Sequence, residues 1–382
     1  MKKRNIMKTL FAGTMTLGMA LSISPALAIS DEEIYKGDEN HPAELWLAKE
    51  LNVAEGVTYD SKEFNFDFTL THFNDVTKVD NKLNDLLDTT LTVSSDDKKD
   101  SKNVLYNKTF DAAGKYTFDV IEDEQNDLDD KGYGLTVSKA KYTVDVYVKN
   151  KIAGTGTYVY SVVVNKELDD SGNASTGKVD PNPGVNQGDN SGFRFVNTYT
   201  KQAGTKDPED SNKNLALSIS KTVAGDFADK THGFTFNVTI NLPTTAAKPS
   251  YDGYVGEEKY TFNNNTATTV TLTHGQKLKF EDLPAGTRYT VTETGTTGYT
   301  PSASIIENGS SATVANANKG QDLEVENKLV GENANSTAFT NTYDDNSVNP
   351  TGIIINNLPF VLMVAIAGSG LALYVVSKRR AH

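Results

Sequence analysis

The stretch SGFRFVNTYTK, residues 191–201, predicts a β-strand and raises a chemical question. Read with a period of two, one face of this strand carries Phe193, Phe195, Asn197 and Tyr199. Three aromatic side chains on one face indicate that the face is buried. The stretch TAFTNTYDD, residues 337–345, repeats the alternation around Asn341. An asparagine in the middle of a buried aromatic face needs an explanation in both places.

Further segments recur in the same order, which predicts two copies of one domain. Alternating runs rich in Thr, Val, Tyr and Phe, separated by Gly, Asn and Asp, are typical of β-sandwiches. The first copy reads ELWLAKELNV (44–53), FNFDFTL (64–70) and YTFDVIE (116–122), and the second reads LALSISKTV (215–223), FTFNVTI (234–240) and YTVTE (289–293). Each copy then closes with its Asn-Thr-Tyr strand. Residues 43–51 alone would also fit a helix, and the clearer second copy favours a strand. We therefore predict an all-β fold with two tandem sandwich domains.

The same alternation points polar side chains into both predicted cores. The triplet is Lys49, Glu122 and Asn197 in the first copy and Lys221, Glu293 and Asn341 in the second. Taken singly, an inward lysine protects an edge strand from aggregation, a glutamate at a strand end is usually solvated, and a buried asparagine usually bonds to backbone. Two matching triplets favour another interpretation, because an unpaired buried charge costs several kcal/mol.

Burial gives these three residue types a specific chemistry. It lowers the pKa of a lysine and raises the pKa of a glutamate, so the amine becomes a neutral nucleophile and the acid a proton donor. The amine can then attack the asparagine carboxamide while the acid polarises the C=O and shuttles protons, and ammonia leaves. We expect a Lys–Asn isopeptide bond that ties the first strand of each domain to its last. This is a single-turnover reaction of the chain on itself, and no site for turnover of an external substrate is visible, so we do not expect an enzyme.

The composition excludes several classes of partner and of stabilising bond. The formal net charge is −13, and all 50 acidic residues lie between 31 and 345, which argues against nucleic acid or anionic membranes as partners. The chain has no cysteine, so it cannot use disulfides as covalent staples. Its five histidines show no metal-binding spacing, and we expect no metal and no cofactor.

Both ends of the chain carry export and sorting features. Residues 1–28 read as a signal peptide, with a basic start, an apolar run and Ala26-Leu27-Ala28 before the expected cut; a true membrane anchor is the alternative. Near the other end, VNPTG (348–352) precedes an expected membrane span at 353–376 and a basic tail at 377–382.

The order of motif, span and basic tail resembles the cell-wall sorting signal of Gram-positive surface proteins. The resemblance implies that a sortase cuts between Thr351 and Gly352 and joins the new threonine carboxyl to an amine, so the membrane is a partner only before sorting. Proline directly precedes the threonine, unlike the commonest Leu-Pro-x-Thr-Gly pattern, which leaves the class of sortase open. A plain tail-anchored protein is the alternative.

The chain as a whole resembles Gram-positive backbone pilins of the streptococcal type, built from two isopeptide-linked Ig-like (CnaB-type) domains. The motifs that carry the resemblance are LAKEL and ISKTV for the lysines, the two Val-x-Glu strand ends for the acids, and FVNTY and FTNTY for the asparagines. The resemblance implies that Lys166, in YVYSVVVNKELDD (158–170), accepts the sortase-cut threonine of the next subunit. It also implies the partners: a sortase, other copies of this chain joined head to tail, peptidoglycan, and pilins at the tip and base.

The expected organisation is a first domain at 38–200, a linker at 201–212 and a second domain at 213–345. Residues 169–190 are polar and read as a loop inside the first domain, since Asn197 must still close it. The expected product is a covalent cell-surface pilus shaft subunit. The main alternative is a monomeric wall-anchored adhesin with the same cross-linked domains, in which Lys166 has no role, and a secreted enzyme is a more distant one.

Overall fold

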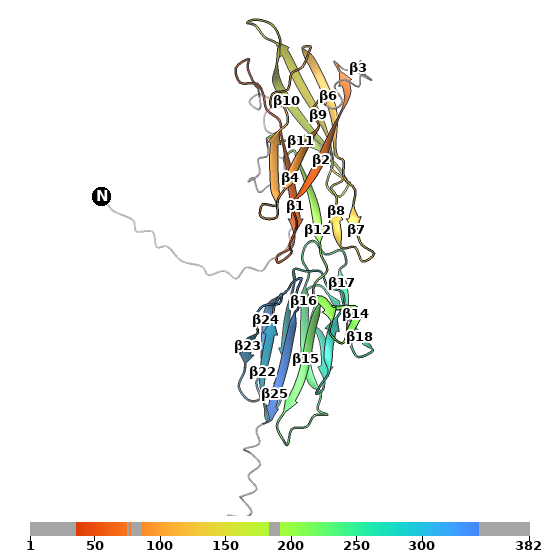
Figure 1. Ribbon diagram of the computed structural model, residues 1–382, viewed down its shortest axis with the longest axis vertical. Helices are drawn as coiled ribbons and strands as arrows, with labels where there is room; N and C mark the ends of the chain where they lie inside the picture. Colours follow the sequence, from red (N-terminus) through yellow and green to blue (C-terminus); the bar gives the residue numbers. More distant parts are fainter. Residues whose placement is uncertain (1–35, 75, 78–85, 183–191, 344–382) are drawn as a thin grey trace, which may run out of the picture.

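The computed structural model describes residues 36–74, 76–77, 86–182 and 192–343, and it shows strands without helices in this part of the chain. The predicted all-β fold is therefore confirmed. Two domains lie end to end along the long axis of the molecule (Figure 1), and each has its own apolar core. The expected signal peptide, sorting motif, membrane span and basic tail lie outside the described residues. Within the described ranges, no helix is long and apolar enough to cross a membrane.

The first domain is a sandwich of two sheets. One sheet has the order β5-β1-β12-β8-β7, and the other has the order β11-β10-β9-β6-β2-β3, with β4 paired to β2. The strands of the first sheet are β1 (Trp46–Val53), β5 (Lys99–Asn103), β7 (Asp127–Leu128), β8 (Gly134–Thr136) and β12 (Arg194–Thr200). Those of the second are β2 (Lys62–Phe73), β3 (Val76–Thr77), β4 (Thr89–Val93), β6 (Gly114–Glu122), β9 (Lys141–Asn150), β10 (Thr157–Leu168) and β11 (Ala174–Val179).

The second domain repeats this plan. A seven-stranded sheet, β18-β17-β20-β15-β25-β22-β23, faces a four-stranded sheet, β19-β16-β21-β24. The strands of the larger sheet are β15 (Leu217–Ala224), β17 (Ser250–Val255), β18 (Glu258–Asn263), β20 (Lys277–Phe280), β22 (Tyr299–Ile306), β23 (Thr313–Asn316) and β25 (Ser336–Tyr343). Those of the smaller sheet are β16 (Phe234–Asn241), β19 (Thr268–Leu272), β21 (Thr287–Glu293) and β24 (Leu323–Val330).

In both domains the first long strand pairs in parallel with the last. β1 lies beside β12, and β15 lies beside β25. A parallel pair cannot be joined by a tight turn, so the whole domain forms the connection between the two strands. Within residues 43–51, which alone would also fit a helix, the chain forms a strand from Trp46 onward, and this strand pairs with β12 from the other end of the domain.

The segment 201–212, expected to be a linker, differs from that expectation. It contains β13 (Thr205–Asp207) and begins β14 (Asp210–Leu215), which together form a hairpin. Ala203 is fully buried in the second core. Asp207 forms an ion pair with Lys279, with 2.9 Å between Oδ2 and Nζ. The Asp and Pro residues of this stretch favour turns and therefore suggested a linker. In the structure the stretch forms part of a hairpin that packs on the second domain and is ion-paired to it. Part of the expected loop 169–190 is likewise a strand, β11, paired with β10.

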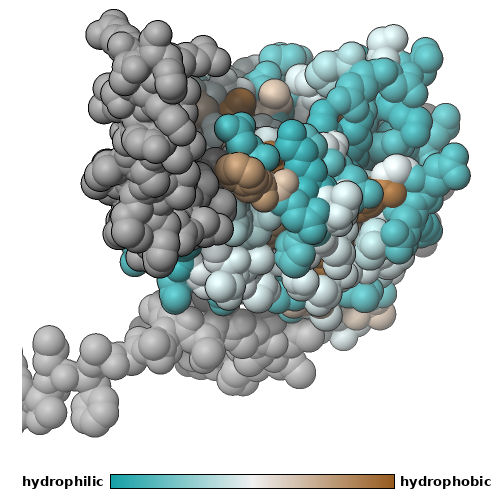
Figure 2. All heavy atoms as spheres, turned by 90° about the horizontal axis from the view of Figure 1, so that it is seen from below, coloured by the Kyte–Doolittle hydropathy of each residue, from teal (hydrophilic) through white to brown (hydrophobic). Residues whose placement is uncertain are grey.

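Specific contacts join the two domains. Val57, in the loop after β1, is buried in the second core. Glu55 pairs with Arg288 at 2.7 Å, and Tyr133 donates a hydrogen bond to Asp282 at 2.8 Å. Glu55 and Val57 lie in the loop after β1 and Tyr133 lies between β7 and β8, so two separate loops of the first domain contact the second. The end-on view in Figure 2 shows a surface that is largely hydrophilic with scattered apolar residues, as the acidic composition predicts.

Candidate functional site

The first predicted triplet comes together between the two sheets of the first domain. Lys49 on β1 and Asn197 on the adjacent parallel strand β12 face the same side, since Asn197 is paired with Leu51, two residues after the lysine. Glu122 is the last residue of β6 in the opposite sheet, where it is paired with Phe66. The lysine and asparagine thus come from one sheet and the acid from the other.

The three side chains contact one another in a buried position. Lys49 Nζ lies 2.7 Å from Glu122 Oε2, and both side chains have no exposed surface. Asn197 is also fully buried, and its Nδ2 donates a hydrogen bond to Glu122 Oε1 at 2.6 Å. One carboxyl group therefore holds the lysine amine with one oxygen and the asparagine amide with the other.

The second triplet occupies the same place in the second domain. Asn341 is paired with Val223, two residues after Lys221, and Glu293 is paired with Phe236 at the end of β21. Lys221 Nζ and Asn341 Nδ2 both bond to Glu293 Oε1, at 2.5 and 2.8 Å. The register that brings lysine, asparagine and acid together is therefore identical in the two domains.

Aromatic rings surround both amines. Lys49 Nζ lies 4.6 Å from the centre of the Phe64 ring, and Lys221 Nζ lies 4.1 Å from that of Phe234. Phe64 lies near the start of β2 and Phe234 is the first residue of β16, so the alternation that builds each core also builds the wall of the site. The rings exclude water while their electron-rich faces tolerate a nearby cation.

Burial shifts the pKa values of all four ionisable groups toward neutrality. It lowers the pKa of Lys49 and of Lys221 to about 8, and the facing glutamate only partly offsets this effect. It raises the pKa of Glu122 and of Glu293, again against the pull of the lysine. Both shifts make the transfer of a proton from nitrogen to oxygen less costly than between the same groups in water, and the transfer leaves a neutral amine beside a carboxamide.

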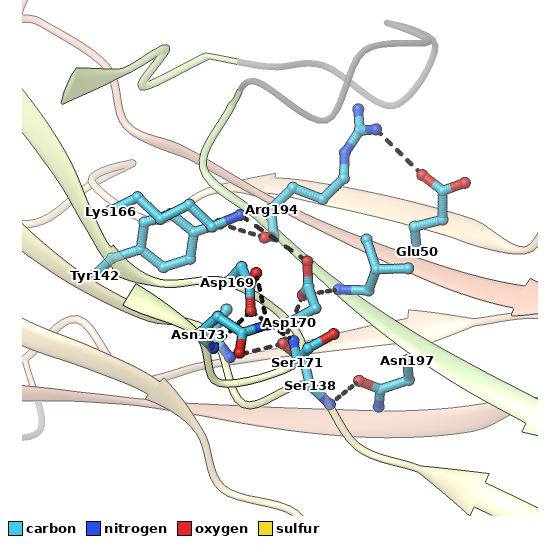
Figure 3. Close-up of polar contacts among 12 residues, drawn as sticks. Glu50, Ser138, Tyr142, Lys166, Asp169, Asp170, Ser171, Asn173, Arg194 and Asn197 are labelled. Atoms are coloured by element: carbon cyan, nitrogen blue, oxygen red, sulfur yellow. Dashed lines mark hydrogen bonds and ion pairs between the residues drawn. The ribbon is translucent and has the colours of Figure 1, made fainter. Parts of the chain in front are cut away.

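The carbonyl of Asn197 is held differently from our expectation. From the sequence we expected the glutamate to polarise this carbonyl group. In the structure, Glu122 instead accepts a hydrogen bond from the amide nitrogen of Asn197. Asn197 Oδ1 accepts a hydrogen bond from the backbone N–H of Ser138 at 2.8 Å (Figure 3). Ser138 was missed because a backbone donor has no sequence signature. In the second domain, Asn341 Oδ1 is buried and has no hydrogen-bond partner among the described residues.

Lys166, the expected acceptor, lies on β10, and only 12% of its side chain is exposed. Its Nζ is 3.9 Å from Asp170 Oδ2 and 5.5 Å from the centre of the Tyr142 ring. The amine must leave these contacts before an enzyme can use it. Thr351 and Gly352, the expected sortase cleavage site, lie outside the described residues. No cluster of metal-ligating side chains occurs in the ranges that the structure describes.

Comparisons with known proteins found similar chains among pilus proteins of Streptococcus pyogenes. Residues 215–343 match a family described as a domain of unknown function, DUF7601. The pilus tip adhesin Cpa of Streptococcus pyogenes is 34% identical over 143 residues, which cover 36% of this chain and 18% of that protein. The match thus spans less than a fifth of the adhesin's length.

Solved structures of pilus proteins are also similar. The major pilin protein T3.2 from Streptococcus pyogenes is 22% identical with a TM-score of 0.33, covering 79% of this chain and 98% of that one. A major pilin from the same organism is 19% identical with a TM-score of 0.32, covering 79% and 99%. This chain thus shares sequence similarity with part of a pilus protein of Streptococcus pyogenes.

Proposed function

We propose that this chain is the shaft subunit of a covalent, sortase-assembled cell-surface pilus that supports adhesion. Within each domain a Lys–Asn isopeptide bond forms by itself: Lys49 to Asn197 and Lys221 to Asn341. The observation that carries the proposal is the pair of buried triplets in identical register, each bound to one carboxyl group.

The proposed reaction balances without any external reagent. A proton passes from the lysine to the glutamate, and the neutral Nζ attacks Cγ of the asparagine. The new C–N bond forms and the amine gives up its second proton to the glutamate, which passes one proton to Nδ2; the Cγ–Nδ2 bond then breaks, ammonia leaves, and the other proton remains on the glutamate. Glu122 and Glu293 already bind both nitrogens, so each can take a proton from one and give it to the other.

The proposed bonds suit a protein that bears tension. A chain without cysteine needs another covalent staple outside the cell, and the cross-links join the first strand of each domain directly to its last. Force that enters through one strand then passes into its neighbour through a covalent bond rather than through the hydrogen bonds of the sheet. The subunits would be joined by Thr351 of one copy and Lys166 of the next, and the last copy would pass to peptidoglycan.

Mutation of the expected acceptor tests the assembly step. In the cell, Lys166→Ala should abolish the ladder of high-mass species in wall extracts and leave a single wall-linked band. Lys178→Ala is the matched control, because Lys178 lies on the neighbouring strand β11 and is more exposed. An unchanged ladder in the Lys166→Ala variant would show that Lys166 is not the acceptor lysine.

The alternative function is a wall-anchored adhesin that does not polymerise. The similarity to a pilus tip adhesin favours keeping it, since that relative is named for a terminal position. The two functions differ in one observable: a shaft subunit gives a mass ladder that grows with its own copy number, whereas an adhesin gives one band whatever its abundance.

A further inference from the structure

The two sites differ at the oxygen on which charge would develop. In the first domain the Ser138 N–H donates to Asn197 Oδ1 at 2.8 Å, and Ser138 is 7% exposed. In the second, Asn341 Oδ1 has no donor among the described residues. The lysine, acid and asparagine are otherwise arranged in the same register. The Ser138 N–H is thus a feature of the first site that the shared triplet does not explain.

Asp170 holds this donor in position. Its Oδ1 accepts hydrogen bonds from Ser138 Oγ at 2.6 Å and from the backbone N–H of Val196 at 2.8 Å. Its backbone oxygen accepts a further bond from the N–H of Lys139 at 3.0 Å. Val196 directly precedes Asn197 on β12, so Asp170 fastens the loop after β8 to the strand that carries the reacting asparagine (Figure 3).

We propose that the Ser138 N–H acts as an oxyanion-hole donor for cross-linking of the first domain, and that Asp170 is its positioning residue. When Lys49 Nζ attacks Cγ of Asn197, the π electrons of the carbonyl move onto Oδ1, and the hydrogen bond from Ser138 strengthens as that charge grows. The charge returns to the C=O bond when Cγ–Nδ2 breaks and ammonia leaves. A donor already in place needs no reorganisation during the reaction.

This inference rests on the proposed cross-linking reaction. It concerns the rate at which the first of the two isopeptide bonds forms. Loss of a single oxyanion-hole donor typically slows a reaction by about 10²–10³-fold. Asp170→Ala displaces the donor rather than deleting it, so we expect the first bond to form at least about tenfold more slowly. The second bond, in the same molecule, should form at an unchanged rate.

The conservative variant Asp170→Asn distinguishes the hydrogen bonds that position Ser138 from the negative charge of Asp170. The asparagine Oδ1 can still accept from both Ser138 and Val196, while the charged contact with Lys166 Nζ is lost. We therefore expect Asp170→Asn to restore most of the rate lost in Asp170→Ala. A role through the Lys166 contact would instead make the two variants equally slow.

The experiment starts from the unlinked, urea-unfolded two-domain chain, residues 31–346, recovered from inclusion bodies. After dilution into buffer, samples are quenched in acid at intervals and digested, and the linked peptide of each domain is quantified by mass. Trp46 is the only tryptophan of the chain and lies on β1, so its fluorescence follows folding of the first domain separately from the chemistry. The second domain provides the internal reference.

The expected result is slow linkage of the first domain in Asp170→Ala, with a normal Trp46 signal, a normal second domain, and recovery in Asp170→Asn. An unchanged linkage rate in Asp170→Ala would overturn the inference. So would a lag in Trp46 recovery that accounts for the whole delay, or equal slowing by both variants. Absence of both bonds from the wild-type chain would instead refute the proposed function itself.

Discussion

Replacing Glu122 by glutamine should remove the first cross-link while keeping the shape of its core. Glutamine can neither take a proton from the attacking amine nor pass one to the leaving nitrogen, but its side-chain oxygen can still accept a hydrogen bond from Nζ. The variant therefore isolates the effect of the missing covalent bond from that of a cavity. Asn197→Ala should have a similar effect on stability, because it removes the same bond from the other side.

The size of the effect follows from the length of chain that the bond encloses. Lys49 and Asn197 are separated by nearly the whole first domain, and a closed loop of about 150 residues gives roughly 5 kcal/mol of stabilisation through the entropy of the unfolded chain. For a domain of this size each kcal/mol corresponds to about 2–4 °C, so we expect the melting temperature of the first domain to fall by roughly 10–20 °C.

Thermal unfolding followed by Trp46 fluorescence measures this directly, since the only tryptophan lies beside the cross-link in β1. The matched control is Glu124→Gln, two residues further on, which removes only a surface ion pair with Lys62 at 3.5 Å and should leave the melting temperature nearly unchanged. If Glu122→Gln lacks the bond by mass yet melts within a few degrees of the wild type, the loop-entropy reasoning is refuted. If it retains the bond, the role assigned to Glu122 is wrong.

Three further predictions concern pH, force and the domain joint. Because burial lowers the pKa of Lys49 to about 8 and raises that of Glu122, the pair holds two protons in acid, one near neutrality and none in alkali; quenched mass analysis should show linkage slowing both in acid, where the amine stays charged, and well above pH 8, where the glutamate no longer carries the proton that it passes to the leaving nitrogen. Single-molecule stretching from the chain ends should not extend the segment between Lys49 and Asn197, whereas Asn197→Ala should release it; equal extension in both would contradict the proposed path of force. Val57→Asp places a carboxylate in the joint and should broaden the interdomain angles seen by small-angle scattering with both bonds intact; an unchanged profile would show that Val57 does not restrain the joint.

The alternation of side chains predicted the fold and the composition of both triplets. A period of two is enough to place Lys221 and Asn341 on a buried face, and the repeat then resolved the ambiguous strand around Lys49. The structure brings each triplet within hydrogen-bonding distance of one carboxyl group. The pattern succeeded because strand periodicity reports burial directly, and the two copies provided independent readings of one arrangement.

The remaining features depend on backbone and on contacts between distant segments. The Ser138 N–H acts through the main chain, which any residue except proline would supply, so no residue type reveals it. The hairpin of β13 and β14 was missed because Asp, Pro and Asn favour turns in linkers and in tight hairpins alike. Val57 reads as a loop residue, and only the position of the second domain makes it part of a core.

The intact mass of the chain spanning residues 31–346 shows directly whether the two isopeptide bonds form. If both isopeptide bonds form, the mass is lower than that of the sequence by two ammonia molecules. Glu122→Ala and Glu293→Ala should each restore one of them, measured against the mass of the variant's own sequence. A deficit of one ammonia in the wild type would mean that one of the two triplets does not react. The full mass of the unreacted sequence would contradict the account, and the six buried side chains would then be two ion pairs and two amides within ordinary cores.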